Sequence, residues 1–328
     1  MIAMATSKPW IPRMHLWEID DQPWFPSFLR AFVQTGLTHA WTVHLPLLQP
    51  SSPAEVVANT LRRILGATVS RFTYIDFCAG AGGPTPFIER ALNSQLAHTN
   101  APSAKVNGVD DAASDTTPSY AAVADPKTET ASDDGAVDFV LTDLHPHVES
   151  WEAASKKSDR LTYVSRPVDA ANAPAELLRQ YAQKGNKKGI FRLFNLAFHH
   201  FDDDLARAIL KNTIETSDGF GIFELQDRTL GGFVTCLLFG FFIFLVAPFL
   251  YWWSPLRLFY VYAVPIVPFV LTFDGIISCL RTRTADEVEA LLRTCGADSD
   301  GWEIRSGREQ VLWPCGYLSW VICSKKAT

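Results

Sequence analysis

The sequence is short of paired cysteines and of clustered basic residues, and each shortage excludes a class of protein. Its six cysteines form no CxxC pair and have no histidine near them at metal-ligand spacing, so we expect neither a disulfide framework nor a metal site. The net charge is −6 and no Lys/Arg cluster appears, which argues against a nucleic-acid partner. The N-terminus has no uninterrupted apolar run, so we expect no cleaved secretion signal. A reduced compartment fits these absences.

Short apolar runs alternate with helical patterns along most of the 328 residues. Such alternation predicts a parallel sheet covered by helices, that is, a doubly wound α/β fold. We expect a helical stretch over 14–66 and a further helix over 202–217. We expect strands within the following segments: 71–78, 136–144, 161–170, 189–201, 219–227, 301–309 and 317–326.

Changes in composition divide the chain into four parts. We expect an N-terminal helical lid (1–70), a Rossmann-like core (71–228), an apolar membrane-associated segment (229–273), and a C-terminal helix and strands that complete the core (274–328). Within the core, residues 99–135 are rich in Ala, Ser, Thr and Asp. This stretch has too little apolar surface to offset the entropy of ordering, so we expect a disordered loop.

A glycine-rich turn lies where the first expected strand meets a helix. It reads Asp76-Phe77-Cys78-Ala79-Gly80-Ala81-Gly82-Gly83. Glycine lets the backbone approach a ligand closely, and the helix that follows offers free N–H groups, which favours a nucleoside ligand. Taken alone, the same turn also serves as an ordinary strand-to-helix connection.

A carboxylate follows the next strand. Asp143 stands where doubly wound nucleotide binders place an acid that accepts both ribose hydroxyls. It is separated from Gly82 by more than the usual interval, and the 99–135 loop accounts for the excess. The alternative is a solvated aspartate at a strand end.

These residues resemble the first motif of the class I S-adenosylmethionine-dependent methyltransferases. The run IDFCAGAGG matches hydrophobic-Asp-x-Gly-x-Gly-x-Gly, with Asp76, Gly80 and Gly82 in register and Cys78 in place of the usual first glycine. The order of further segments resembles a bacterial and fungal group of methyltransferase-like proteins: DQPWFP (21–26), TDLHPH (142–147), RLFNLAFHHF (192–201), IFELQDR (222–228) and DGIISCLRTRTADE (274–287). The resemblance implies the fold of that family and S-adenosyl-L-methionine as cofactor.

The resemblance also suggests a role for Asp169, which follows the third strand. It is similar to the acidic residue that meets the adenine amino group in many methyltransferases. A plain loop aspartate is the alternative.

Two groups of polar residues are candidates for contacting the methyl acceptor. His199 and His200 leave the fourth strand at its C-terminal edge, where one of them is placed to take a proton from an acceptor. The alternative is that one histidine only packs there while Asp202 caps the next helix. Asp274, Ser278 and Arg281 would share one helical face.

That helical face has two interpretations. It is either a wall that contacts the substrate beside the cofactor, or an interfacial cap where Arg281 and Arg283 meet lipid headgroups.

One long apolar segment separates the core from the C-terminal part. No charged residue occurs between Arg228 and Arg257, and residues 231–253 suffice to cross a hydrocarbon layer that needs about 20 residues. Because the C-terminal strands must rejoin the sheet, the chain has to turn back through 256–273. This predicts a hairpin, a re-entrant loop or a monotopic lid on a lipid bilayer, with the catalytic domain facing the cytosol.

The sequence thus predicts an enzyme that methylates O or N on a small, lipophilic acceptor. Two other functions remain open. A nicotinamide-dependent oxidoreductase would share the architecture, although the G-x-G-x-x-G spacing and a Tyr-x-x-x-Lys pair are lacking. A membrane scaffold that keeps the fold without catalysis is the other.

Overall fold

A seven-stranded mixed sheet forms the centre of the protein. The computed structural model describes residues 8–100, 135–182 and 189–326, so the loop expected at 99–135 lies, apart from its ends, outside the described residues. The strand order is β3-β2-β1-β4-β5-β7-β6. The strands are β1 (Phe72–Phe77), β2 (Phe139–Thr142), β3 (Leu161–Tyr163), β4 (Gly189–Asn195), β5 (Gly219–Glu224), β6 (Trp302–Leu312) and β7 (Gly316–Lys325).

The sheet is the Rossmann-like doubly wound sheet expected from the sequence, with one reversed edge. Strands β1 to β5 are parallel, whereas β7 is antiparallel to both β5 and β6. The chain moves outward from β1 to β3 and then returns to place β4 on the other side of β1. The direction of winding therefore reverses between β1 and β4, which is where open α/β sheets bind ligands.

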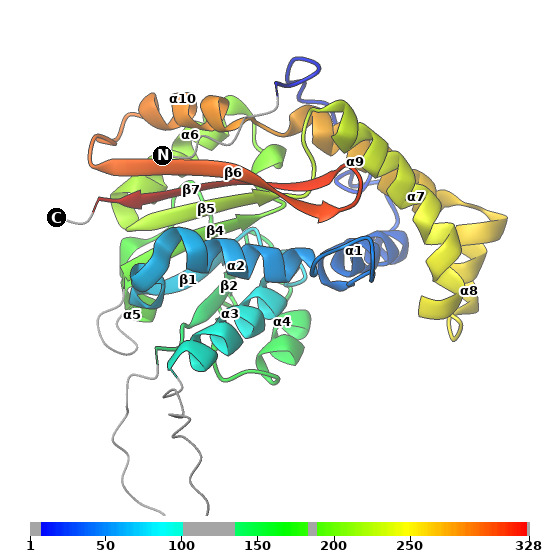
Figure 1. Cartoon of the computed structure of the whole chain (residues 1–328), viewed down its shortest axis with the longest axis horizontal. Coiled ribbons are helices and arrows are strands. Elements are labelled where there is room, and N and C mark those ends of the chain that lie inside the picture. The colour runs from blue at the N-terminus through cyan, green and yellow to red at the C-terminus, as the bar shows by residue number, and fades with distance from the viewer. Residues whose placement is uncertain (1–7, 101–134, 183–188, 327–328) are drawn as a thin grey trace, which may run out of the picture.

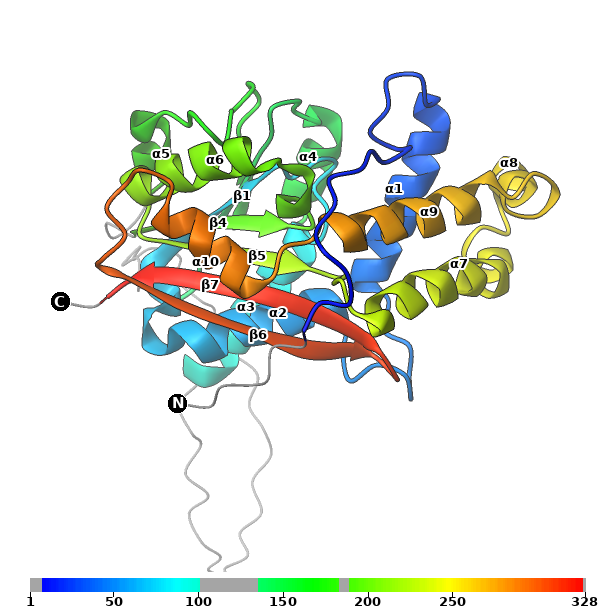
Figure 2. The same ribbon diagram turned by 90° about the horizontal axis from the view of Figure 1, so that it is seen from above.

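Helices cover both faces of the sheet (Figures 1 and 2). One face packs against α2 (Pro53–Leu65) and α3 (Thr85–Asn100), with Trp151 of α4 (Val148–Ser155) in the same apolar cluster. The other face packs against α5 (Ala175–Ala182), α6 (Asp203–Thr216) and α10 (Ala285–Arg293). Two separate apolar cores therefore hold the sheet rigid from both sides.

Local capping explains where two of these helices begin. The Ser52 side chain accepts a hydrogen bond from the Glu55 backbone N–H, and the Glu55 side chain accepts one from the Ser52 N–H, which starts α2. The Asp202 side chain accepts a hydrogen bond of 2.8 Å from the Leu205 N–H and starts α6. The predicted cap at Asp202 is confirmed.

The N-terminal segment (residues 8–26) contains neither helix nor strand, so the prediction of helix from residue 14 onward is wrong for its first part. Helix α1 (Ser27–Thr42) begins only after Pro26. The segment is held by long-range bonds instead, because the Asp274 carboxylate accepts from the backbone N–H groups of Ile19 (2.7 Å) and Asp20 (2.9 Å). Within the segment, residues 19–25 form turns in which the Gln22 N–H donates to the Ile19 carbonyl and the Phe25 N–H to the Gln22 carbonyl.

A helical arm (residues 230–281) extends from one end of the sheet (Figures 1 and 2). It consists of α7 (Leu230–Leu250), α8 (Pro255–Leu258), the short η3 turn (Phe259–Ala263) and α9 (Ile266–Arg281). Helix α9 packs back along α7, and α1 packs against α9. At Gly240 a Cβ atom would lie 1.8 Å from Thr272 Oγ1, so only glycine permits this close approach of α7 and α9.

Helix α7 is long and apolar enough to cross a membrane, by length and composition alone. Only 17% of its most apolar 18-residue stretch is buried in the protein. Its large exposed apolar side chains are Leu230, Val234, Leu237, Leu238, Phe241, Leu245 and Phe249. At 100° per residue these positions fall on one side of the helix.

Candidate functional site

The glycine turn lies at the C-terminal end of β1, beside the reversal between β1 and β4. Cys78, Gly80 and Gly82 have φ values of 63°, 51° and 108°. The cysteine therefore adopts the left-handed conformation for which a glycine is expected, at a cost of about 1–2 kcal/mol for a residue with a Cβ. The shape of the turn is kept in spite of the substitution.

Asp143 lies against this turn. Its Oδ2 accepts a hydrogen bond of 2.8 Å from the Gly80 backbone N–H, and its Oδ1 accepts one of 2.8 Å from the His145 N–H. Each carboxylate oxygen has a second lone pair, so both oxygens are still able to accept from hydroxyl groups. The structure thus brings together the two motifs that the sequence analysis singled out.

Asp76 lies beneath the turn and is 1% exposed. Its Oδ2 accepts a hydrogen bond from the Thr85 hydroxyl, which in turn accepts one of 3.0 Å from Asn195 at the end of β4. Burial raises the pKa of Asp76 to about 8. Its Oδ1 is buried and has no hydrogen-bond partner among the described residues.

Asp169 lies on the same side of the sheet and is exposed. Its Oδ1 accepts a hydrogen bond of 2.8 Å from the Ala171 N–H. Burial raises the pKa of the Cys78 thiol, and the negative charges of Asp143, Asp76 and Asp169 raise it further. All three predicted acids are therefore close enough to Cys78 to interact with it electrostatically.

A second polar group is centred on His199, which is 2% exposed and lies in the short η2 turn (Phe198–His200) after β4. Its Nδ1 lies 2.8 Å from Glu224 Oε2 at the end of β5, and its backbone N–H donates to Glu224 Oε1 at 3.1 Å. Burial lowers the pKa of His199 to about 3 and raises that of Glu224 to about 8. Glu224 is 4% exposed, so its side chain is buried beneath the histidine and not paired at the surface.

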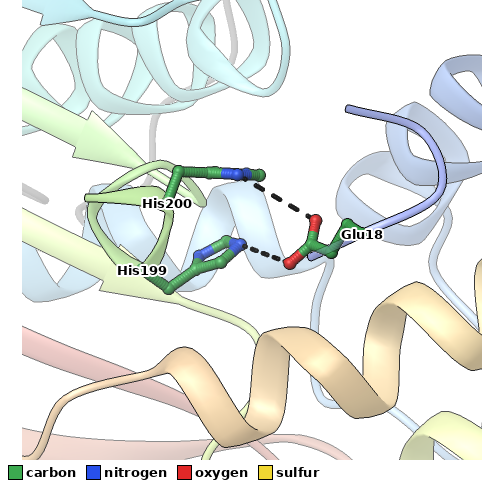
Figure 3. Close-up of side chains that lie close together, drawn as sticks. All are labelled: Glu18, His199 and His200. Atoms are coloured by element: carbon green, nitrogen blue, oxygen red, sulfur yellow. Dashed lines mark ion pairs between the residues drawn. The ribbon is translucent and has the colours of Figure 1, made fainter. Parts of the chain in front are cut away.

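Glu18 of the N-terminal segment faces the two histidines (Figure 3). Its Oε1 lies 3.7 Å from His199 Nε2, and its Oε2 lies 4.0 Å from His200 Nδ1. The Ser278 hydroxyl donates to Glu18 Oε1 at 2.9 Å. Burial raises the pKa of Glu18 to about 7. His200 Nδ1 also lies 3.1 Å from Asp21 Oδ2.

The polar face of α9 holds the N-terminal segment in this position. Asp274 accepts from two backbone N–H groups of the segment, Ser278 bonds Glu18, and the Arg281 guanidinium lies 3.3 Å from Glu18 Oε1. Their predicted common face is confirmed. Arg281 and Arg283 are only 5% and 8% exposed, so the interpretation that they meet lipid headgroups is wrong.

A pocket of about 400 Å³ opens at the end of β5 and reaches this cluster. Its wall is partly apolar and partly charged, and includes Phe198, His199, Glu224, Arg228, Tyr317 and Trp320. Thr229, which caps the N-terminus of α7, also lines it. The pocket therefore joins the buried histidine to the base of the helical arm.

Sequence reasoning missed Glu18 and did not recognise the importance of Glu224. Glu18 lies more than 180 positions before His199, and neither acid belongs to a motif whose spacing reveals a ligand. Glu18 does lie three residues before the DQPWFP segment, so the position of that segment was the one available signal.

The class defined by fold and site is a doubly wound α/β protein with a glycine turn and an acid on the neighbouring strand. No protein-family model matches the chain, and no curated protein gives a significant match.

Solved structures give loose overlaps. They include the plantazolicin methyltransferase BamL in complex with a desmethylPZN analogue and SAH (12% identity, 91% of this chain and 100% of that one, TM-score 0.42). Human N-acetylserotonin methyltransferase in complex with SAM is 11% identical, with 84% of this chain and 56% of that one covered and a TM-score of 0.36. A putative Zn-dependent alcohol dehydrogenase from Rhodobacter sphaeroides is 13% identical, with 84% of this chain and 98% of that one covered and a TM-score of 0.37. Overlaps this loose do not decide the reaction.

Proposed function

We propose that the protein transfers a methyl group from S-adenosyl-L-methionine to a small acceptor. The observation that carries the proposal is the hydrogen bond of 2.8 Å between the Gly80 N–H and Asp143 Oδ2. It places an acid with spare lone pairs directly beside a backbone turn shaped for close approach, the pairing that binds a ribose above a doubly wound sheet. The cofactor supplies the reactive methyl group, and the protein has to bind and orient.

The remaining predicted acids have roles consistent with this cofactor. Asp169 is exposed at the same edge and is proposed to meet the adenine amino group, whereas Asp76 is buried and is proposed to support the turn from below. Cys78, Gly80 and Gly82 contribute backbone rather than side chains. Their left-handed conformations shape the surface on which the cofactor would lie.

The acceptor is proposed to bind in the 400 Å³ pocket at the end of β5. His199 borders this pocket, is neutral at physiological pH because burial lowers its pKa to about 3, and is oriented by Glu224. It is proposed to orient an O or N nucleophile by accepting a hydrogen bond from it. His200, Arg281 and Asp274 position the N-terminal segment that closes over it.

The helical arm supports a membrane-associated acceptor. An all-apolar helix that is mostly exposed needs a covering partner, and α7 has no charged residue along its length. Its exposed side chains form one stripe along the whole helix, so we propose that α7 lies in the plane of a bilayer. We favour this over a spanning arm because α1, which carries Arg30 and His39, packs against α9 and would have to enter the hydrocarbon with it.

The arm also connects the bilayer to the acceptor pocket. Thr229 lines the pocket and begins α7, so a lipophilic acceptor has a short route between them. The sequence contains no CxxC pair or disulfide framework, and we propose that the catalytic side faces the cytosol.

The test is transfer of a labelled methyl group from S-adenosylmethionine into an extract divided into organic and aqueous fractions. We expect a labelled product in the organic fraction, and none with the Asp143→Ala variant. A product found only in the aqueous fraction contradicts the lipophilic acceptor. Cofactor binding without transfer in either fraction contradicts the enzymatic assignment and leaves the membrane scaffold.

A further inference from the structure

Three possible metal-ligating side chains meet at one place from distant parts of the chain. Glu18 comes from the N-terminal segment, and His199 and His200 come from the turn after β4 (Figure 3). One ligating atom from each lies within 4.8 Å of the other two. Glu18 and His199 are buried, and His200 is partly buried. No other group of three or more such residues with this geometry occurs in the part of the chain that the structure describes.

His199 directs an unpartnered nitrogen into this group. Its Nδ1 is bonded to Glu224, whereas its Nε2 has no hydrogen-bond partner among residues 8–100, 135–182 and 189–326. A histidine whose Nδ1–H donates to a carboxylate carries a lone pair on Nε2. The nearest carboxylate oxygen, Glu18 Oε1, lies 3.7 Å from that atom, which is too long for a hydrogen bond.

When His199 Nδ1 donates to Glu224, Nε2 presents a lone pair toward Glu18. That nitrogen is buried without a partner in the described chain, whereas Glu18 Oε1 accepts from the Ser278 hydroxyl at 2.9 Å, and a buried acceptor left unpaired is unfavourable. The Arg281 guanidinium compensates part of the charge, at 3.3 Å from Glu18 Oε1 and 3.4 Å from Asp21 Oδ2. Glu18, Asp21 and Glu224 place three carboxyl groups around the two imidazoles, and the charges of Arg283 and Arg13 also act on His199.

We propose that Glu18, His199 and His200 bind a divalent transition-metal ion of the zinc or iron(II) class. Two imidazole nitrogens and one carboxylate oxygen are the donor set that such ions take when some positions stay open for water or substrate. The bond from His199 Nδ1 to Glu224 is the outer contact that orients a metal-binding histidine. At metal–ligand distances of about 2.0–2.2 Å, ligand atoms lie roughly 3–3.5 Å apart. The observed separations are 3.7 Å from His199 Nε2 to Oε1 and 4.0 Å from His200 Nδ1 to Oε2, with one ligand atom of each residue within 4.8 Å of the others, so the side chains would move closer on binding an ion.

This inference goes beyond the proposed methyl transfer and differs from the sequence-based expectation of no metal. Ion binding requires neither S-adenosylmethionine nor an acceptor. If both proposals hold, one of the three ligands, His199, also lines the acceptor pocket, and a divalent ion there would supply Lewis-acid chemistry. The expectation failed to consider Glu18, because only the fold brings that residue to the histidines.

The experiment is calorimetric titration of the metal-free full chain with Zn²⁺, together with Co²⁺ absorption spectra that report the ligand geometry. We expect one ion per chain. The Glu18→Gln and His200→Ala variants should each weaken binding at least tenfold, and Glu224→Gln should weaken it by about 10–100-fold through loss of the outer contact. His200 is only partly buried, so its variant is expected to fold even if substitutions at Glu18 do not.

The matched control is His44→Ala, which removes an exposed histidine outside the cluster and should leave Zn²⁺ affinity unchanged. The proposal is overturned if the wild-type chain binds no ion, or if His200→Ala and Glu18→Gln bind as tightly as the wild type. Because these titrations contain no S-adenosylmethionine, their failure is distinguishable from a failure of the proposed methyl transfer.

Discussion

At the scale of single residues, the site depends on carboxylates that the fold buries to different degrees. Asp143 is half-buried and bonded to backbone N–H groups, whereas Asp76 is enclosed and bonded to one hydroxyl. The two aspartates therefore have different functions. Asp143 faces the ligand with lone pairs to spare, and Asp76 supports the turn from below.

The burial of Asp76 predicts a measurable dependence of stability on pH. Its pKa is about 8 in the folded protein and 3.8 ordinarily, so between these values the folded state holds a proton that the unfolded state has lost. The contribution of this group is therefore fully present below pH 4 and is lost as the pH rises toward 8, by at most about 1.4 kcal/mol per pH unit. In Asp76→Asn the free energy of unfolding should fall less steeply over this range.

Urea unfolding at several pH values between 5 and 8 measures this difference. Asp204→Asn, a substitution at an exposed position of α6, should keep the wild-type slope. Identical slopes for Asp76→Asn and the wild type would show that Asp76 is not held protonated.

At the scale of elements, the helical arm (residues 230–281) differs most from the rest of the fold, because its apolar side chains are exposed. Its helices pack closely through small residues such as Gly240, and its outer stripe has no protein cover within the described chain. A bilayer that covers the stripe would bury it along its whole length, because the exposed positions recur every three or four residues.

We expect the wild-type protein to sediment with phosphatidylcholine vesicles and the double variant Phe241→Glu/Leu245→Glu to lose at least tenfold in partitioning, since two charges would enter an apolar layer. Leu205→Glu is the matched control, because it replaces an exposed leucine on α6, away from the arm. If the wild-type protein forms a dimer without vesicles and the double variant does not, a second copy of the chain covers the stripe. That result would contradict the proposal that lipid covers it.

The in-plane orientation has its own readout. Fluorophores at positions 234 and 249 should be quenched by lipid-attached quenchers at the same depth. A spanning helix would place these positions roughly 20 Å apart in depth, so unequal quenching would contradict the in-plane arrangement.

At the scale of the whole molecule, the sheet and the cofactor side were predictable, and much of the acceptor side was not. The glycine turn, Asp143 and the central strands are marked by local patterns, and the fold brings them to one edge. Glu18 reaches His199 only because Asp274 of α9 binds the backbone of the N-terminal segment. Contacts made between such distant positions leave no periodicity in the sequence.

The N-terminal segment illustrates the same limit. Its apolar and aromatic residues resemble a helical pattern, yet prolines at 23 and 26 and the bonds to Asp274 keep it from forming a helix. Helices α4 and α5, which are eight residues each, were also not predicted, because short helices carry too few turns to show a clear period.

The most direct test of the central claim is calorimetric titration of the full chain with S-adenosylmethionine and S-adenosylhomocysteine. The account predicts that one molecule of either ligand binds per chain, that Asp143→Ala weakens binding by at least about tenfold through loss of charged hydrogen bonds, and that Asp204→Ala binds as the wild type does. A folded wild-type chain that binds neither ligand, or an Asp143→Ala variant that binds with unchanged affinity, would contradict it.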